Sequence, residues 1–339
     1  MDKNFEKGCV LVVGGSGGIG SLCAQEFASS GARVAITYYK NEKAAKQEFE
    51  KRVMDSKRKA IEDNIKDFLD WSFVNIGGFI NVQIPTSGIT GASHHKLSLV
   101  SDPTFTGNKV WEAKRKEWVY ETGVSFNGSE PIDISGVYLN NTFLEAPTGS
   151  GGYTYTLNYQ DGRVLFDNPV NKSSDVEIEY SYRYVQTYKS SVDSGLEINP
   201  DVLAAHRIDM PAVLIEMTDR TVQQPYQIGD AKNKIFQDVL LHVICENPVE
   251  RNNIANALLV QKDKTFHLYD INKVVQSGVY PLSRNGNINP DRLNYDQIVQ
   301  NTEYLDKKAY IQNSVITEFN TVANSIYHNI VRWTIEIFP

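Results

Sequence analysis

The clearest pattern along the chain is an alternation of apolar and polar residues between residues 151 and 188. In the first run an apolar residue occupies every second position: Tyr153, Tyr155, Leu157 and Tyr159. Asp161-Gly162 then supplies the positive-φ positions of a tight turn, and residues 163–167 predict the return strand. After a second turn at residues 168–174, another alternating run follows: Val176, Ile178, Tyr180, Tyr182 and Tyr184. One apolar, aromatic-rich face at period two predicts a β-meander that packs against a core on one side only.

Short strands precede this meander. Residues 79–84, 109–119 and 130–139 each predict a strand, and Gly, Pro, Ser and Asn residues separate them. Together with the meander they make about seven strands at the spacing of a sandwich. We therefore predict a β-sandwich domain over residues 77–195.

The polar segment 190–199 ends at Pro200 and predicts a boundary between domains. Beyond it, residues 212–217 and 221–229 predict two strands, and Pro225 marks the second of them as an edge strand. Residues 234–245 are apolar at their odd positions and predict a long strand.

Asn247 has the sequence features of a helix cap, because Pro248 follows it and Glu250 lies three residues on. The helix is expected to end near residue 261, and a strand follows at residues 266–271. Residues 275–303 predict a long loop or arm. Residues 309–319 and 323–338 predict a closing β-hairpin, so residues 200–339 form an α/β sandwich with a mainly antiparallel sheet.

Residues 54–76 have apolar side chains at helical spacing and predict an amphipathic helix. Met54 opens this segment, which suggests the hypothesis that residues 1–53 are an added extension of a chain that once began at Met54. The predicted fold class is therefore α+β, mainly β, with a βα(β) segment over residues 1–53.

A glycine-rich turn follows the first apolar run, at Gly14, Gly18 and Gly20. Such a turn allows the backbone to approach a pyrophosphate closely at the start of a helix. The run VVGGSGGIGSLCAQEFASSGARVAITYYKNEKAA resembles the opening of a short-chain dehydrogenase/reductase. That resemblance implies a dinucleotide at the glycine turn, with Arg33 and Tyr38–Lys40 suited to the phosphate of NADP.

The resemblance is carried by about the first 45 residues. The family's third strand, Asn-Ala-Gly turn, catalytic Ser and mid-chain Tyr-x-x-x-Lys pair do not follow in order. Tyr39 and Lys43 have the pair's spacing near the second strand, and Tyr304 and Lys308 have it late in the chain. We therefore predict no catalytic residues, no cofactor and no enzyme activity, with an NADP-dependent oxidoreductase as the alternative. We also expect no cluster of titratable groups with perturbed pKa values.

Charge, apolar runs and cysteine content argue against several classes of protein. The net charge of −7 and the absence of a basic block argue against a protein that grips nucleic acid by its phosphates. No apolar run approaches the ~20 residues that a membrane helix needs. Three scattered cysteines favour a reducing cytosol over a disulfide framework.

The histidines offer little evidence for a metal site. His94-His95 has a metal-site interpretation, but no Cys lies near and adjacent side chains of an extended chain point opposite ways. His242 and His328 fall on predicted strands, where structural histidines are expected. We predict no metal site.

The order of the segments DWSFVNIGGFINVQIP, VWEAKRKEWVYETGV, YQDGRVLFDNPV and PYQIGDAKNKIFQDVLLHVICENPVERNNIANALL resembles a neck or tail structural protein of a tailed bacteriophage over residues 54–339. The C-terminal part resembles the tail-terminator fold. The resemblance implies a virion protein, assembled in the host cytoplasm, that forms a ring, by the family's symmetry a hexamer. Its partners would be sister copies and neighbouring neck, tail tube or sheath proteins, with DNA only passing through a channel. A baseplate or tail-fibre attachment role is a second alternative.

Overall fold

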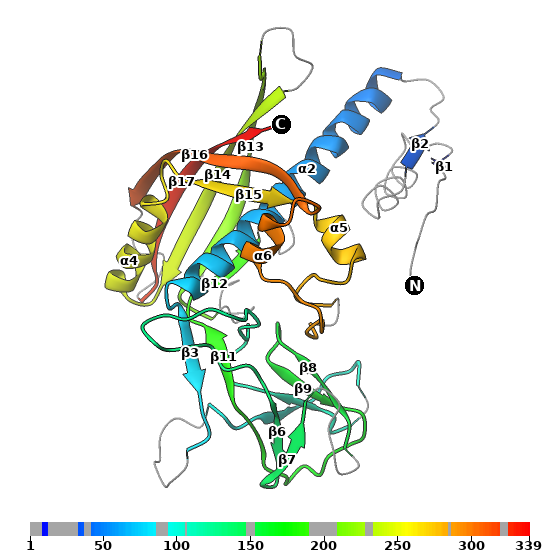
Figure 1. The fold of residues 1–339 in the computed structure, drawn as a ribbon, viewed down its shortest axis with the longest axis vertical. Coiled ribbons are helices and arrows are strands. Elements are labelled where there is room, and N and C mark those ends of the chain that lie inside the picture. Colours follow the sequence, from blue (N-terminus) through cyan, green and yellow to red (C-terminus); the bar gives the residue numbers. More distant parts are fainter. Residues whose placement is uncertain are drawn as a thin grey trace. The chain divides into compact units, whose positions relative to one another are not determined.

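The computed structural model describes residues 9–12, 33–36, 42–85, 94–105, 107–146, 153–189, 209–227, 233–283, 286–318 and 325–339. The chain divides into two compact units, residues 1–63 and residues 64–339. The division falls inside the long helix α2, Glu42–Asn75, so this helix contributes to both units (Figure 1). The helix runs without a break across residue 53, where the sequence predicted a domain boundary.

In the first unit, strands β1 (Cys9–Val12) and β2 (Arg33–Ile36) pair in parallel. Cys9 lies opposite Arg33 and Val12 lies opposite Ile36. Two parallel neighbours need a crossover connection of a dozen or more residues, and residues 13–32 have that length. The predicted βα(β) order is consistent with this pairing, but its glycine turn lies outside the described residues.

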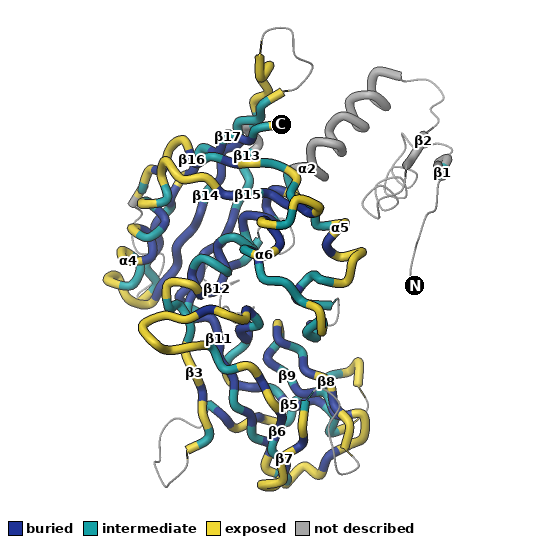
Figure 2. Tube along the Cα trace, in the orientation of Figure 1, coloured by how far each residue is buried: buried dark blue, intermediate teal, exposed yellow. Residues whose placement is uncertain are grey.

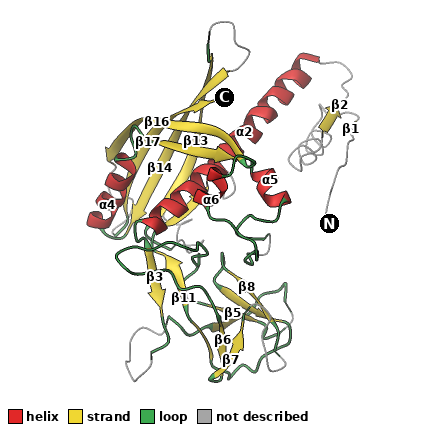
Figure 3. Ribbon diagram, in the orientation of Figure 1, coloured by secondary structure: helices red, strands yellow, loops and turns green. Residues whose placement is uncertain are grey.

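The second unit begins with a sandwich part, residues 79–183 (Figure 3). A four-stranded sheet has the order β4-β5-β9-β8, a three-stranded sheet has the order β10-β6-β7, and β11 pairs with β3. The bounds are β3 Phe79–Val82, β4 Ser98–Val100, β5 Val110–Glu112, β6 Gly136–Leu139, β7 Thr142–Glu145, β8 Tyr155–Asn158, β9 Arg163–Phe166, β10 Val176–Ile178 and β11 Tyr180–Arg183. Side chains from these sheets share one buried core around Trp118, Val137, Val164 and Tyr180.

The predicted meander is only partly right. The alternation placed the strands and their buried face correctly, because Tyr155, Leu157, Val176, Ile178 and Tyr180 are all buried. However, β9 does not pair with β10. Strand β9 pairs with β5 and β8, β10 pairs with β6, and β11 pairs with β3. Period two identifies which face is buried but carries no information about which strand is the neighbour.

The rest of the second unit is built on a six-stranded sheet of order β12-β13-β14-β17-β16-β15. Only the pair β12-β13 is parallel, and the other pairs are antiparallel. The bounds are β12 Gln186–Lys189, β13 Ala212–Pro225, β14 Asn233–Cys245, β15 Thr265–Tyr269, β16 Leu305–Glu318 and β17 Tyr327–Phe338. The two strands predicted at 212–217 and 221–229 are one strand, with a register shift between Met217 and Thr221.

One face of this sheet is built from fully buried apolar side chains. Val239, Leu241 and Val243 on β14 and Trp333 and Ile335 on β17 are fully buried, as the odd-position pattern predicted (Figure 2). The Nε1 of Trp333 donates to the carbonyl of Leu258 in helix α4, Pro248–Leu259, so α4 covers this face.

Helix α2 crosses the same face and binds both edge strands. Asn64 exchanges hydrogen bonds with the backbone of Tyr269 in β15, with distances of 2.8 and 3.1 Å. Asp70 accepts a hydrogen bond from Thr187 in β12. Six residues of helix span about 9 Å, whereas the edges of a flat six-stranded sheet lie about 24 Å apart. The sheet must therefore curl around α2.

Two short helices lie at the start and near the end of the segment that was predicted as a loop. Helix α5 spans Ile271–Gln276 and helix α6 spans Tyr295–Gln300. A reciprocal capping box between Asn294 and Gln297 begins α6. In α4 the predicted cap at Asn247 is present and binds the amide of Val249, but Glu250 accepts from the Tyr184 hydroxyl at 2.7 Å and does not complete a capping box.

Residues 279–283 and 286–294 form a strap that joins the sheet part to the sandwich part. Leu282 and Ile288 pack against the sandwich core, and the carbonyl of Gly286 accepts from the amide of Tyr159 at 2.9 Å. Arg292 donates to the carbonyl of Tyr120 at 3.1 Å. The arm predicted from sequence is therefore packed on the protein's own sandwich in this part of the structure.

The described secondary structure is mixed α+β and dominated by sheets, which confirms the coarse fold class. None of the described helices is both long and apolar enough to cross a membrane.

Gly162 allows a sharp test of the β8-β9 turn. Its φ is +64°, and an added Cβ would lie 2.7 Å from the carbonyl oxygen of Arg115. We expect Gly162→Ala to lower the free energy of unfolding by about 2–4 kcal/mol. Gly278→Ala is the matched control, because its φ is +75° but its Cβ would meet nothing, and it should cost about 1–2 kcal/mol. Urea denaturation followed by circular dichroism measures both, and equal losses would contradict the steric argument.

Candidate functional site

The glycine turn is the functional site that the sequence indicates, and the strand pairing gives its backbone frame. In a parallel pair the carboxyl ends of both strands lie at the same edge. The turn leaves β1 after Val12, and residues 37–40 leave β2 after Ile36, at this shared edge. Open sheets of this type bind ligands outside the carboxyl ends of their strands. Gly14, Gly18, Gly20 and Tyr38–Lys40 themselves lie outside the described residues.

The register separates Arg33 from that edge. Arg33 is the first residue of β2 and lies opposite Cys9, three residues before Ile36. At about 3.3 Å per residue, this places its backbone about 10 Å from the carboxyl edge. The backbone frame therefore favours Tyr38–Lys40 over Arg33 as the contact for an NADP phosphate. The cofactor role of Gly14, Gly18 and Gly20 stays a prediction.

A buried ionic cluster joins helix α2, strand β11 and Glu121, which lies between β5 and β6 in the chain. The Lys66 Nζ lies 2.6 Å from Asp70 Oδ2, and the Arg183 guanidinium binds both oxygens of Glu121 at 2.6 and 3.2 Å. The Arg183 Nε lies 3.9 Å from Asp70, and its guanidinium carbon lies 4.5 Å from the centre of the Tyr120 ring. Arg183, Glu121 and Asp70 are each 98% or more buried in their side chains.

The neighbouring cations favour the ionised form of the Asp70 carboxyl. Burial opposes ionisation of this carboxyl, but the charges of Lys66 and Arg183 outweigh it and lower the pKa of Asp70. Burial raises the pKa of the Tyr120 hydroxyl. The expectation of no perturbed cluster was therefore wrong, because its members are far apart in sequence. Burial raises the pKa of the Glu121 and Glu117 carboxyls, although both interact with these cations. The close pairing of Arg183 with Glu121 and of Lys66 with Asp70 fits a structural ion-pair network.

The Tyr-x-x-x-Lys pairs do not form a reductase site in the described structure. Tyr304 is buried in a core cluster with Tyr269 and Ile298, and Lys308 lies on β16. Lys43 lies in the first unit's part of α2, whereas Tyr39 lies outside the described residues.

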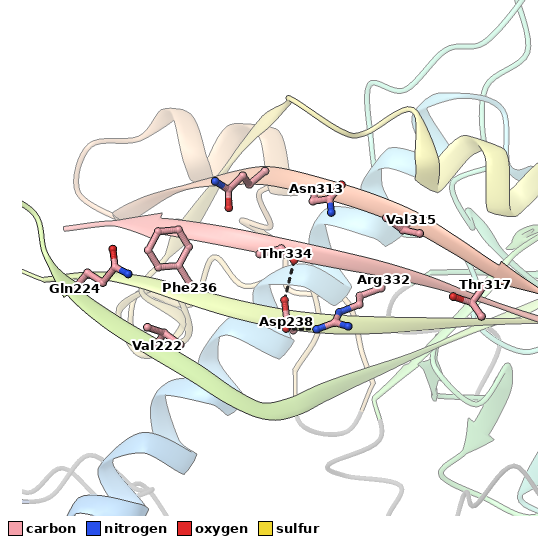
Figure 4. A pocket seen from close by; sticks show the side chains of 10 residues that line it. Val222, Gln224, Phe236, Asp238, Asn313, Val315, Thr317, Arg332 and Thr334 are labelled. Atoms are coloured by element: carbon pink, nitrogen blue, oxygen red, sulfur yellow. Dashed lines mark hydrogen bonds and ion pairs between the residues drawn. The ribbon is translucent and has the colours of Figure 1, made fainter.

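A polar groove lies on the face of the six-stranded sheet opposite to α4 (Figure 4). Asp238 is its centre and binds Thr334 at 2.8 Å and Arg332 at 2.5 Å. Val222, Phe236 and Val315 line it from β13, β14 and β16. Alternation along each strand explains this composition, because the residues between the buried ones point to this second face.

Two histidines continue this face as a hydrogen-bonded relay. The His242 Nε2 lies 2.7 Å from Glu216 Oε2, and its Nδ1 lies 3.1 Å from the Nε2 of His328. A carboxylate only accepts, so His242 donates through Nε2 and accepts through Nδ1 from His328. Burial lowers the pKa of His242, and burial together with the charges of His242 and Arg251 lowers the pKa of His328 to about 4. Both ring nitrogens of His242 thus have partners, and the structural role of the two histidines stays a prediction.

His94 and His95 have different environments in the sandwich part. The carbonyl of His94 accepts from the Tyr180 hydroxyl at 3.0 Å, and the Nε2 of His95 lies 3.4 Å from Glu177. In the described part of the chain, no group of three or more His, Cys, Asp or Glu residues could hold a metal ion.

Comparison with known proteins gives one match. The model of the short chain dehydrogenase family matches residues 8–74, about a fifth of the chain. Neither the search of curated proteins nor the search of solved structures found a match. The matched segment begins just before β1 and ends in the last turn of α2, so it extends past the first 45 residues, on which the resemblance rested.

This match corrects one prediction and supports another. The N-terminal segment is similar to a short-chain dehydrogenase, as the glycine spacing indicated. The prediction that the chain is not an enzyme is contradicted, because the matched family is a family of oxidoreductases. That prediction rested on the missing downstream motifs and gave too little weight to the opening βα(β) pattern. The comparisons returned no phage protein.

The histidine relay predicts a pH-dependent stability. His328 has a folded pKa of about 4 and an ordinary value of 6.5, so the unfolded chain takes up a proton first. Stability from this group is present above pH 6.5 and is lost as the pH falls toward 4. We expect His328→Gln, which keeps a donor for His242, to flatten this fall in melting temperature. An unchanged slope in His328→Gln would contradict the assignment.

Proposed function

We propose that the chain is a nicotinamide-dinucleotide-binding protein of the oxidoreductase class, and that its N-terminal segment binds NADP(H). The observation that carries this proposal is the short chain dehydrogenase match over residues 8–74, together with the parallel pairing of β1 and β2. The glycine turn would receive the pyrophosphate at the carboxyl edge of these strands.

The proposal assigns a role in cofactor binding to the glycine turn and to Lys40. The backbone amides of the Gly14–Gly20 turn would bind the pyrophosphate. Lys40, beyond the carboxyl end of β2, would contact the additional phosphate that distinguishes NADP from NAD. The substrate would be a compound that accepts a hydride, such as a carbonyl compound. No described Tyr and Lys pair is assigned to proton transfer.

Calorimetric titration with NADPH tests the proposal. We expect micromolar affinity for the full chain, and a loss of at least about tenfold in Gly18→Trp, because a side chain at this position fills the space of the pyrophosphate. Val275→Trp adds the same side chain at a position that is 53% exposed on α5, and it should leave the affinity unchanged. An absence of NADPH binding in the wild-type chain, or equal binding in Gly18→Trp, would overturn the proposal.

Charge reversals in the same titration locate the additional phosphate. Lys40→Glu should weaken NADPH binding by about tenfold and leave NADH binding unchanged, because one ion pair of this kind is worth about 1.4 kcal/mol. Arg33→Glu should affect the two cofactors equally, because Arg33 lies at the amino end of β2. The opposite ranking would show that the contact is made from the amino end.

We propose as a second candidate that residues 54–339 are a ring-forming structural part of a tailed-phage virion, at the neck or tail. The segment order of the sequence favours a tail-terminator role, with a baseplate or fibre-attachment role as the variant. In this proposal the partners are sister copies and neighbouring neck, tail tube or sheath proteins. DNA only passes through the ring, and the protein is located in the virion.

An uncharged strand edge supports this second candidate. Strand β15 pairs with β16 only as far as Tyr310, so residues 312–317 have no neighbour on that side among the described strands. These residues, QNSVIT, contain no charge, and Val315 is 48% exposed. Natural edge strands are usually protected by charges, prolines or short length, and an unprotected edge is suited to pairing with another chain.

Light scattering coupled to size exclusion tests the ring. We expect a closed oligomer of the full chain, with the hexamer that the family resemblance implies. Val315→Lys should shift it toward monomers, because a lysine on the pairing edge disfavours strand addition. Val260→Lys, at the C-cap of α4 and at a position that is 62% exposed, should leave the oligomer intact. A monomer at every concentration, or equal behaviour of both variants, would contradict the ring.

A further inference from the structure

The outer face of the four-stranded sheet carries a second groove, which neither proposed function uses. Strands β8 and β9, the loop before β5 and the strap enclose a hollow of about 540 Å³. A second hollow of about 350 Å³ adjoins it, and Phe105 and Lys109 line both. The groove is thus an elongated depression on a sheet face, rather than an enclosed pocket.

The charges of this groove cancel. Lys109 and Arg163 are balanced by Asp161 and Asp167 among the residues that line the larger hollow. Two further carboxylates pair with Arg163. Its Nε lies 2.7 Å from Glu112, and its Nη1 lies 3.2 Å from Asp102. A site of this charge offers little attraction to a phosphate or a carboxylate.

The same groups keep hydrogen-bonding capacity in fixed positions. A guanidinium has five N–H donors, and the two bonds to Glu112 and Asp102 leave others for a ligand. Asn158 is held in place by Asp161, since its Nδ2 donates to the carboxylate and its Oδ1 accepts from the Asp161 amide, both at 2.9 Å. Polar groups fixed in advance lose little entropy when they bind a ligand.

Asn287 supplies an amide without a competing partner. It lines the groove from the strap, and its Oδ1 is buried and has no hydrogen-bond partner in the described structure. This acceptor is therefore not committed to another group of the described structure. An amide offers both donors and an acceptor.

An exposed aromatic ring completes the site. Phe105 is 40% exposed between the two hollows. Leu165 adds apolar surface to the larger hollow. The combination is an apolar patch with uncharged or mutually neutralised groups that both donate and accept hydrogen bonds.

We propose that this groove binds a neutral carbohydrate chain. A sugar ring has an apolar C–H face that packs on an aromatic ring, and hydroxyls that donate and accept at once. The groove offers Phe105 for the first, and Arg163, Asn158 and Asn287 for the second. Its elongated shape suits several sugar units better than one. The proposal requires neither dinucleotide binding nor ring formation, because all its residues lie in the sandwich part and the strap.

Titration of the full chain with soluble oligosaccharides tests the proposal. The probes are maltoheptaose, cellohexaose, chitohexaose and mannohexaose, with calorimetry as the readout. We expect at least one of them to bind with a dissociation constant of about 1 mM or tighter, and its affinity to fall at least about tenfold in Phe105→Ala and in Asn287→Ala. Phe143→Ala is the matched control, because Phe143 is 41% exposed on β7, outside the groove.

Each outcome of the titration either supports or contradicts the proposal. Unchanged circular dichroism and melting temperature confirm that Phe105→Ala and Asn287→Ala are folded. Binding that survives both substitutions, or that falls equally in Phe143→Ala, would overturn the assignment to this groove. The absence of binding for all four probes would overturn the carbohydrate class. Tight binding of inorganic phosphate, run as a fifth probe, would show that the charge argument is wrong.

Discussion

Asn64 and Asp70 of helix α2 bind opposite edges of the six-stranded sheet, and this double attachment sets the shape of the second unit. Six helical residues cannot reach the two edges of a flat sheet, so the sheet has to curl. The curl brings its buried face around α2 and α4 and leaves the other face to the polar groove and the histidine relay. Loss of this attachment would remove the hydrogen bonds between the helix and both edge strands, which would then be held only by their neighbouring strands.

The buried Arg183 extends the same constraint to the sandwich. It lies at the end of β11, directly before β12 enters the large sheet, and binds Glu121 from the sandwich side and Asp70 from the helix. Burial of an arginine costs free energy, and the bidentate pairing with Glu121 offsets that cost, although the Arg183 Nε has no hydrogen-bond partner in the described structure. The cluster therefore holds three elements in one arrangement, which explains why so polar a group lies where an apolar core would be expected.

The sequence alone predicted the helices and strands better than it predicted which strands pair with each other. The odd-position pattern of β14 and β17 gave their buried face, and Asn247 gave the start of α4, because both signals are local. The pairing of β10 with β6 and the curl around α2 depend on contacts between distant residues, which no local period records. Helix α6 was missed although Asn294 and Gln297 carry its capping box. The glycine turn was recognised from its spacing, whereas the distinction between Arg33 and Lys40 required the strand register.

The strap has a consequence for how such proteins can be recombined. Leu282 and Ile288 complete the core of the sandwich, although they follow β15 in the chain and the sandwich strands precede β12. A fragment cut at the ends of the sandwich would lose these side chains and leave the Tyr159 amide without its acceptor. The transferable module is therefore discontinuous in sequence, and a genetic exchange that moves the sandwich without the strap would deliver an incomplete domain to its new host protein.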